Sequence, residues 1–204
     1  MNISQYCIIN DSAIIGKKTV IMNFVEISNN SRIGDNCIIE SKASISKNCK
    51  IGNNVIIGKS TIIEDGAIIE NNVKIGDFCI IRKNAKISSN CKFTAYCEIR
   101  ENVKIGENTT FGSRCTISAN AEIGKNVIIK YGFVLTDTPN LKDGDLKAVG
   151  RIGDGTLIGA NVCLMPGFSI GNNSIIGANS QVRNMVGDNE IWYGSPAKFF
   201  KKNF

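Results

Sequence analysis

The chain contains no histidine and only 5 leucines, 3 prolines and 1 tryptophan among its 204 residues. The absence of histidine excludes every reaction that needs an imidazole base and every metal site built from imidazole ligands. The shortage of leucine, beside 34 isoleucines, argues against a helical fold, because the β-branched isoleucine side chain lowers helix propensity and fits a pleated surface. We therefore expect an all-β protein whose chemistry does not involve histidine.

Long apolar runs and dense charge clusters are also missing. No apolar run approaches the ~18 residues of a membrane span, and the first ten residues, MNISQYCIIN, lack the basic and apolar segments of a signal peptide. The net charge of +6 comes from scattered basic residues, apart from Lys198, Lys201 and Lys202 near the end of the chain. This distribution favours a small anionic ligand over a nucleic acid. We expect a cytoplasmic protein with no nucleic-acid partner and no membrane insertion.

Isoleucine recurs at every sixth position. From Ile3 to Ile129 there are 22 such positions, of which 20 are isoleucine and the other two are Phe93 and Phe111. The period resumes at Ile152 and continues to Val182. A fixed short period over most of a chain is typical of a solenoid.

The third residue after each of these positions indicates how many hexads form one coil. Eleven of the 22 are asparagine, which tolerates the left-handed backbone conformation of a sharp corner. Sorted by a period of eighteen, the asparagines fall into two columns, and the third column contains Tyr6, Phe24, Phe78 and Tyr96 instead. The sequence predicts a parallel β-solenoid of about ten coils, each with three hexads and three unlike corners. The aromatic column is either a contact surface for a partner or a stack of rings along one corner.

The cysteines follow the same repeat. Seven of the eight lie four residues after a repeat position, and no CxxC spacing occurs; they are Cys7, Cys37, Cys49, Cys79, Cys91, Cys97 and Cys115. Cysteine at one repeated position behaves as a small apolar side chain that packs inside a turn. We predict core packing rather than a disulfide framework or a metal site.

The repeat is interrupted once. Glycine often follows the repeat position, but it never does so in one of the three columns. After the interruption, Met165 and Arg183 lack this glycine and lie eighteen residues apart, as expected if they continue the glycine-free column. In that case Ile152 begins the face after the one that starts at Leu135, and residues 136–151 form an excursion loop from an intact coil. We predict a β-helix domain over 1–188, interrupted by 136–151, and a C-terminal capping extension over 189–204.

Hexads such as IGDNCI and IGNNVI, together with the ending Gly194-Ser195-Pro196-Ala197-Lys198, resemble the hexapeptide-repeat acyltransferases, most closely the nucleotide-sugar N-acetyltransferases. The resemblance implies a left-handed parallel β-helix and a homotrimer that binds acetyl-CoA, as co-substrate, between adjacent subunits. Because the chain has no histidine and no paired cysteine spacing, we expect no metal cofactor. Many members place a lysine where this chain has Asn184. The coenzyme-binding residues that the resemblance implies are Gly159, Ala160, Gly177, Ala178, Arg183 and Lys198.

The missing histidine affects the choice of acceptor. Acylation of an alcohol needs a positioned base, which contributes typically 10²–10⁴-fold to the rate, whereas an amine with a pKa of roughly 8 is already partly neutral at cytoplasmic pH. Asp137, at the start of the excursion loop, is the candidate for positioning the amine or accepting its proton. Its other interpretation is a turn-forming residue in TDTPN. The residues expected to contact the acceptor are Lys130, Tyr131, Asn140 and Arg151.

The favoured function is an acetyl-CoA-dependent N-acetyltransferase that acts on a nucleotide-linked amino sugar in the synthesis of surface-polysaccharide precursors. Two alternatives stay open. One is a sugar O-acetyltransferase with a base other than histidine, and the other is a non-catalytic solenoid used for binding or assembly.

Overall fold

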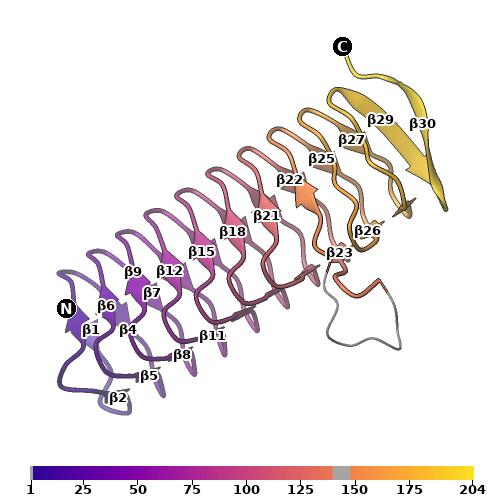
Figure 1. Cartoon of the computed structure of the whole chain (residues 1–204). Helices are drawn as coiled ribbons and strands as arrows, with labels where there is room; N and C mark the ends of the chain where they lie inside the picture. Colours follow the sequence, from indigo (N-terminus) through magenta and orange to yellow (C-terminus); the bar gives the residue numbers. More distant parts are fainter. Residues whose placement is uncertain (1, 140–147) are drawn as a thin grey trace.

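The computed structural model describes residues 2–139 and 148–204, and in this part of the chain every regular element is a β-strand. The strands wind into one elongated, three-sided solenoid, with the two ends of the chain at opposite ends of it (Figure 1). The solenoid has about ten coils, one for each strand of its second sheet. The predicted fold, a left-handed parallel β-helix, is confirmed. None of the described residues forms a helix that could cross a membrane.

The described strands form three sheets, here called faces A, B and C, in which every pairing is parallel except that of the last two strands of face A. Face A consists of β1 (Asn2–Ile3), β4 (Val20–Ile21), β7 (Ile38–Ile39), β10 (Ile56–Ile57), β13 (Lys74–Ile75), β16 (Lys92–Phe93), β19 (Thr110–Phe111), β22 (Ile128–Ile129), β25 (Leu157–Ile158), β27 (Ile175–Ile176), β29 (Glu190–Gly194) and β30 (Ala197–Lys202). Face B consists of β2 (Ile8–Ile9), β5 (Glu26–Ile27), β8 (Ser44–Ile45), β11 (Ile62–Ile63), β14 (Ile80–Ile81), β17 (Glu98–Ile99), β20 (Thr116–Ile117), β23 (Val134–Leu135), β26 (Cys163–Leu164) and β28 (Gln181–Val182). Face C consists of β3 (Ile14–Ile15), β6 (Arg32–Ile33), β9 (Lys50–Ile51), β12 (Ile68–Ile69), β15 (Lys86–Ile87), β18 (Lys104–Ile105), β21 (Glu122–Ile123) and β24 (Arg151–Ile152).

Most strands have only two residues, and the side chains of the two point to opposite sides of the sheet. The second residue of each points inward and stacks in register on its equivalents in the coils before and after it, as Ile57 does on Ile39 and Ile75. From Ile21 to Val182 these inward residues are buried. The hydrophobic core is therefore three isoleucine-rich columns that run the length of the prism, as the six-residue period predicted.

The corners have the backbone conformation that the asparagines indicate. At 20 of the 22 corner positions between residues 6 and 132 the φ angle is positive, and the two exceptions, Tyr6 and Ser12, lie in the first coil. Phe24, Phe78 and Tyr96 also adopt this conformation, at φ between 56° and 62°. The left-handed conformation costs a bulky side chain about 1–2 kcal/mol, so these aromatic corners must be stabilised by contacts of the rings.

The aromatic column does form stacks. The ring centroids of Tyr6 and Phe24 are 5.6 Å apart, and those of Phe78 and Tyr96 are 5.1 Å apart with an interplanar angle of 6°. The guanidinium of Arg114 lies over the Tyr96 ring at 5.9 Å. The four rings are nevertheless 48–57 % exposed. Stacking along the corner is thus observed, and the outer surface of the rings stays open to solvent.

The excursion loop leaves the coil at the corner between faces B and C (Figure 1). The inward side chain of Ile152 stacks on Ile123 of face C, while Leu164 stacks on Leu135 of face B. The solenoid therefore resumes on the face that the glycine-free column predicted. Arg151 belongs to β24 rather than to the loop.

The C-terminal residues extend face A. Strand β29 pairs in parallel with β27, and β30 folds back on β29 in an antiparallel hairpin. Glu190 ties this end together, since it accepts hydrogen bonds from Trp192 Nε1 at 2.8 Å and from Lys202 Nζ at 3.0 Å. Lys202, with a smaller contribution from Trp192, lowers the pKa of Glu190.

The repeated cysteine position has a second role beyond packing. The Cys37 thiol donates to the carbonyl oxygen of Gly52 in the next coil at 3.1 Å, and the Thr19 hydroxyl makes the equivalent bond to Gly34 at 2.8 Å. Cysteine, serine and threonine can therefore share this position, because each is small and offers a donor to the coil that follows. All eight cysteines are unpaired, and six of the seven in the repeat are buried, which confirms the packing interpretation.

Alkylation of the native protein tests this arrangement. Burial raises the pKa of Cys49 and Cys91 to about 11, and thiols without a thiolate population react slowly. At pH 8 we expect iodoacetamide to modify at most the two partly exposed cysteines, Cys7 and Cys163. After unfolding in guanidinium, all eight should react. Intact mass spectrometry distinguishes the two results, and labelling of more than two thiols in the native protein would contradict this packing.

Candidate active site

The residues predicted from the sequence lie along the two edges of face B, near its C-terminal end. On the corner between faces A and B lie Lys130, Tyr131, Gly159, Ala160, Gly177 and Ala178. On the corner between faces B and C lie Asp137 and Arg183, and Arg151 follows as the first residue of β24. Asn140 lies outside the described residues. One chain therefore does not bring the predicted residues together, because the width of face B separates the two groups.

The corner between faces A and B carries a continuous strip, here called the alanine strip: Tyr131, Ala160, Ala178 and Tyr193. Its first three members stack in consecutive coils, held by the hydrogen bonds from Asn161 N to Tyr131 O at 2.9 Å and from Asn179 N to Ala160 O at 2.8 Å. Tyr193 lies beside the end of this column, over Gly177 of the coil before, and pairs with Lys198 of the hairpin. The strip thus has two small side chains between two tyrosines that are 63 % and 52 % exposed.

The glycines beside the strip have a packing reason. A Cβ atom on Gly159 would lie 2.5 Å from the nitrogen of Ala178, and one on Gly177 would lie 2.8 Å from the Cβ of Tyr193. Both distances are shorter than real contacts, so the next coil leaves no room for a side chain. Gly159 and Gly177 are therefore required by the fold whether or not they face a ligand.

The backbone N–H groups of the strip are open to a ligand, and among the described residues those of Asp77, Ala95 and Ser113, in the three coils before it, are unpaired in the same way. On the corner between faces C and A, six of the equivalent N–H groups donate to a carboxylate or amide in the next coil, as Lys125 N does to Asp154 Oδ1 at 2.8 Å. On the corner between faces A and B, Lys59 N is capped in the same way by Asp77. Alanine and tyrosine offer no such acceptor, and among the described residues the N–H groups of Tyr131, Ala160 and Ala178 have no partner. Three donors in consecutive coils are available to the oxygen atoms of a ligand.

Asp137 lies at the base of the excursion loop and is 8 % exposed. Its carboxylate accepts a hydrogen bond from the Thr138 hydroxyl at 2.9 Å, and its carbonyl accepts one from Ala148 N at 2.8 Å. The Ala148 carbonyl in turn accepts from Gly167 N at 2.9 Å. The two ends of the loop are therefore joined to each other and to the next coil, which gives a buried carboxylate a fixed position at the edge of face B.

The predicted phosphate-binding cations divide between the two edges. Lys198 is exposed on β30, opposite Tyr193, and so belongs with the alanine strip. Arg183 is exposed on the corner between faces B and C, in the same column as Thr136 and Met165. The backbone N–H of Arg151 is held by Ser169 Oγ at 2.9 Å. An anionic coenzyme on the alanine strip would meet Lys198 of the same chain, and Arg183 only from a second chain.

Tyr193 is the member of the site that the sequence analysis missed. The hexad count ends at Val182, so a step of six does not reach it. Trp192 pairs with Ile176 and so takes the inward position of its coil. Tyr193, the next residue, therefore occupies the position that Gly177 has one coil earlier.

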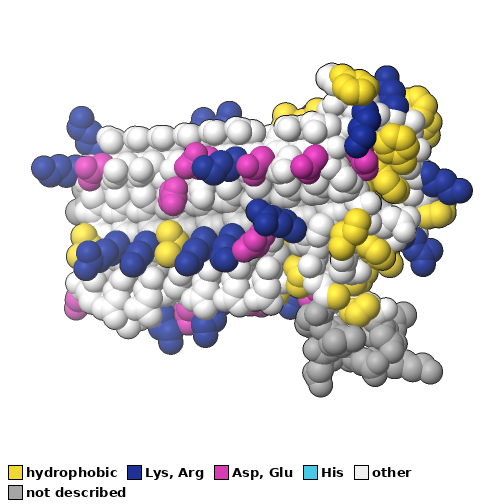
Figure 2. All heavy atoms as spheres, turned by 45° about the horizontal axis from the view of Figure 1, so that its top comes forward, with side chains coloured by type: hydrophobic (Ala, Val, Ile, Leu, Met, Phe, Trp, Pro, Cys, Tyr) yellow, Lys and Arg dark blue, Asp and Glu magenta, His cyan; other side chains and the backbone are white. Residues whose placement is uncertain are grey.

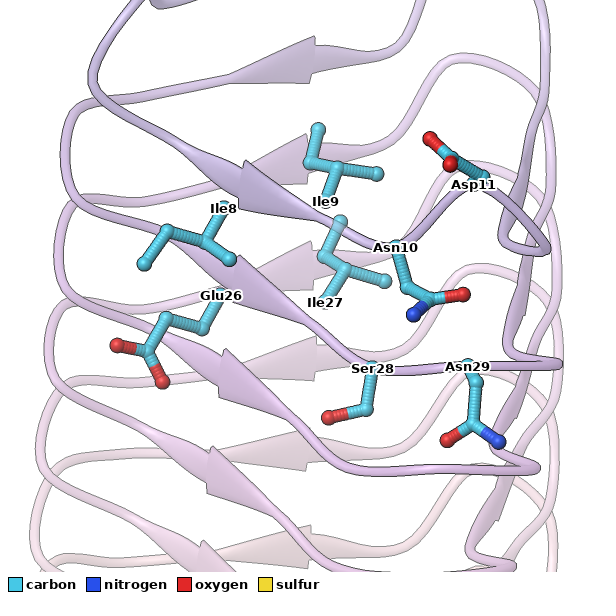
Figure 3. Close-up of a pocket in the computed structure, with 8 residues that line it drawn as sticks. All are labelled: Ile8, Ile9, Asn10, Asp11, Glu26, Ile27, Ser28 and Asn29. Carbon is cyan, nitrogen blue, oxygen red and sulfur yellow. The ribbon is translucent and has the colours of Figure 1, made fainter.

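A hollow in the described part of the chain lies far from these residues. It has a volume of about 440 Å³ and lies at the N-terminal end of face B, seven coils from Leu135. Figure 3 shows its residues on β2, β5 and the corner that follows them. Its charged groups are Asp11 and Glu26, with no cation beside them. It does not resemble a site for an anionic coenzyme.

A three-sided parallel solenoid built from tandem hexads is the fold that the repeat predicted for a hexapeptide-repeat protein. The chain belongs to the bacterial transferase hexapeptide (six repeats) family, whose model matches residues 12–47, 30–65, 42–77, 102–136 and 150–184.

Two curated relatives match over shorter stretches. A protein designated a probable macrolide acetyltransferase, from Lysinibacillus sphaericus, is 45 % identical over 67 residues, which are 33 % of this chain and 37 % of the relative. WbbJ of Escherichia coli (strain K12), designated a putative lipopolysaccharide biosynthesis O-acetyl transferase, is 41 % identical over 64 residues, 31 % of this chain and 32 % of WbbJ. The chain thus spans about a third of the length of these relatives.

A solved structure resembles nearly the whole chain. The UDP-N-acetylglucosamine acyltransferase of Arabidopsis superposes with a TM-score of 0.89 over 98 % of this chain and 74 % of its own, at 18 % identity. At this identity the likeness concerns the fold.

Proposed function

We propose that this protein is an acyltransferase that takes its acetyl group from acetyl-CoA and binds the coenzyme along the alanine strip. The observation that carries the proposal is the row of unpaired N–H groups at Tyr131, Ala160 and Ala178. The amide carbonyls of a coenzyme arm can accept hydrogen bonds from such a row, and Lys198 at its end can pair with a phosphate. The family of the chain and the designations of its relatives support the same activity.

The acceptor that fits this chain best is an amine on a nucleotide-linked sugar. The chain has no histidine, so an alcohol would have to be deprotonated by another base, whereas an amine that is partly neutral needs chiefly to be positioned. Lys130 and Tyr131, at the start of the strip, are proposed to contact the sugar or its diphosphate. The eight unpaired cysteines support a reducing compartment, and we place the reaction in the cytoplasm.

A second candidate is acetyl transfer to a sugar hydroxyl. It is favoured by the buried carboxylate of Asp137 at the edge of face B, which is a fixed base other than histidine. The designation of WbbJ as an O-acetyl transferase also favours it.

The separation of the two groups of residues supports a ring of three chains. The two edges of one face can meet only between different chains, and a head-to-tail contact between such edges closes into a ring when the rotation permits. In this ring the alanine strip of one chain lies against the excursion loop of its neighbour, which brings Asp137 and Arg183 to the coenzyme. The exposed aromatic corner, continuous with the strip, is proposed as part of the contact.

Release of CoA measured with a panel of acceptors tests the reaction. We expect turnover with nucleotide-linked amino sugars and little with the matching hydroxyl sugars. Turnover only with hydroxyl sugars would establish the second candidate, and failure to bind CoA in calorimetry would overturn both. Light scattering should give three times the 22.1 kDa of one chain, and a monomer with full activity would contradict the shared site.

The Asp137→Asn variant tests the carboxylate. We expect kcat to fall about tenfold to a hundredfold, because the amide keeps the size of the side chain but neither accepts a proton nor attracts an ammonium group. The KM for acetyl-CoA should change little. The matched control is Asp65→Asn, since Asp65 occupies the same place after its inward isoleucine, four coils away. Equal kcat values for the two variants would remove Asp137 from the reaction.

A further inference from the structure

Face C carries a row of cations that the proposed function does not use. The outward residues of its strands, called here the cationic row, include Arg32, Lys50, Lys86, Lys104 and Arg151. Figure 2 shows this line of Lys and Arg side chains along the prism. At one strand spacing per coil the row extends over about 30 Å. Glu122 is the one carboxylate among its described members.

The row brings like charges together. Arg32 pairs in register with Lys50, and Lys86 with Lys104, so the cations lie on neighbouring strands about 4.8 Å apart. Like charges that face each other across strands destabilise a sheet. Lys104 is compensated by Glu122 at 2.9 Å. For the other four cations, no carboxylate among the described residues lies within ion-pairing distance.

The distribution is specific to this face. The outward residues of the described strands of face B include no lysine or arginine. The two-residue strands of face A have one such pair, Lys74 and Lys92, and the other lysines of this face lie on the C-terminal strand β30. A random scatter of the net charge would not place five cations on one face and none on the next. The cationic row therefore matches an anionic occupant that is long in one dimension.

Hollows and amide groups accompany the row. Lys86 and Lys104 contribute to a hollow of about 390 Å³ on one side, and Lys104 and Arg151 to one of about 370 Å³ on the other. Exposed asparagine ladders follow both corners, with Asn54 Nδ2 donating to Asn72 Oδ1 at 3.1 Å and Asn102 Nδ2 to Asn120 Oδ1 at 3.1 Å. Each ladder amide uses one of its two N–H groups, which leaves the second for hydroxyl groups.

We infer that face C binds an acidic polysaccharide, an extended chain of sugars with repeated carboxylates or phosphates, along the cationic row. The cations would pair with the charges and the asparagine ladders with the hydroxyl groups. Nucleic acid fits less well, because the described strands of this face present no aromatic side chain for base stacking. An anionic membrane fits less well because the only outward isoleucines are Ile14 and Ile68. Since the row ends at Arg151, a bound chain reaches the base of the excursion loop.

Fluorescence anisotropy with a labelled polygalacturonate fragment tests this inference. We expect saturable binding that weakens as salt is added. The double variant Lys86→Glu/Lys104→Glu should bind about tenfold more weakly, because it inverts two neighbouring charges of the row. The matched control, Lys74→Glu/Lys92→Glu, makes the same change of net charge at the in-register pair of face A and should bind as the natural protein does. Lys86→Gln/Lys104→Gln, which removes the two charges without inverting them, should weaken binding by a smaller factor.

Four results would overturn the inference. They are no binding, equal weakening by the two glutamate variants, equal binding of neutral dextran, and tighter binding of single-stranded DNA or of phosphatidylglycerol vesicles than of polygalacturonate. Calorimetry with CoA on all variants checks the fold and keeps the two sites apart. Loss of polygalacturonate binding with normal CoA binding concerns face C alone, whereas loss of CoA binding by the natural protein concerns the proposed function alone.

Discussion

Replacing Phe133 by alanine is expected to lower the free energy of unfolding by about 3–5 kcal/mol. Phe133 is 0 % exposed and is the largest of the fully buried side chains. It lies one coil beyond Cys115, and the hydrogen bonds from Thr116 N to Phe133 O at 2.8 Å and from Gly132 N to Ser113 O at 2.9 Å fix the spacing of the two coils, so the walls cannot collapse into the cavity. In a solenoid each coil contacts only its neighbours. The substitution therefore destabilises chiefly the coil from which the excursion loop leaves.

Urea unfolding followed by circular dichroism measures this effect. The control is Val134→Ala, the next residue along the chain, whose side chain points out from face B and is 37 % exposed. We expect Val134→Ala to change the free energy of unfolding by less than about 1 kcal/mol. Equal effects of the two substitutions would show that Phe133 does not point into the core.

The repeat made most of the fold predictable. Because the inward residue recurs every sixth position, the sequence specifies the buried side of every strand without any knowledge of distant contacts. The glycine-free column even predicted the register across the excursion, where Ile152 stacks on Ile123. The physical reason is that each coil packs only on its neighbours, so a local pattern determines the long-range structure.

The site was less predictable for the opposite reason. The resemblance implies that Gly159 and Gly177 bind the coenzyme, but both glycines are also required by the close approach of the next coil. The unpaired N–H groups can be recognised only when the coils are aligned. Ala160 occupies the position of Asp77, whose carboxylate accepts the hydrogen bond of Lys59 N, and alanine has no such acceptor. The division of the residues between two edges also depends on which corner each hexad forms.

The role of the aromatic corner also could not be predicted from the residue pattern alone. A column of rings is compatible with stacking and with a contact surface, and both leave the same pattern of residues. The structure shows stacking between Phe78 and Tyr96, at corner positions whose φ angles disfavour large side chains. Stacking compensates part of this cost, while the exposed outer surfaces of the rings match the proposed contact between chains.

The substitution Ala160→Asp is expected to weaken the binding of CoA by about a hundredfold, equivalent to about 2.7 kcal/mol. Position 160 is equivalent to Asp77, whose carboxylate accepts the hydrogen bond of Lys59 N at 2.8 Å. An aspartate at 160 should cap Tyr131 N in the same way, which removes one donor from the alanine strip and places a negative charge beside an anionic coenzyme. The fold should tolerate it, because the chain already uses this cap at other corners.

Calorimetry with CoA and the kcat/KM for acetyl-CoA both measure the effect, and they should fall together. Ala95→Asp is the matched control, since residue 95 occupies the same column three coils away; its CoA affinity should equal that of the natural protein. Ala160→Asn separates the two causes, because the amide oxygen caps the same N–H without adding charge. If Ala160→Asn binds CoA weakly, the blocked donor explains the loss, and if only Ala160→Asp does, repulsion explains it. Normal CoA affinity in both would place the coenzyme elsewhere, because a ligand lying on the alanine strip cannot avoid a side chain that rises from its middle.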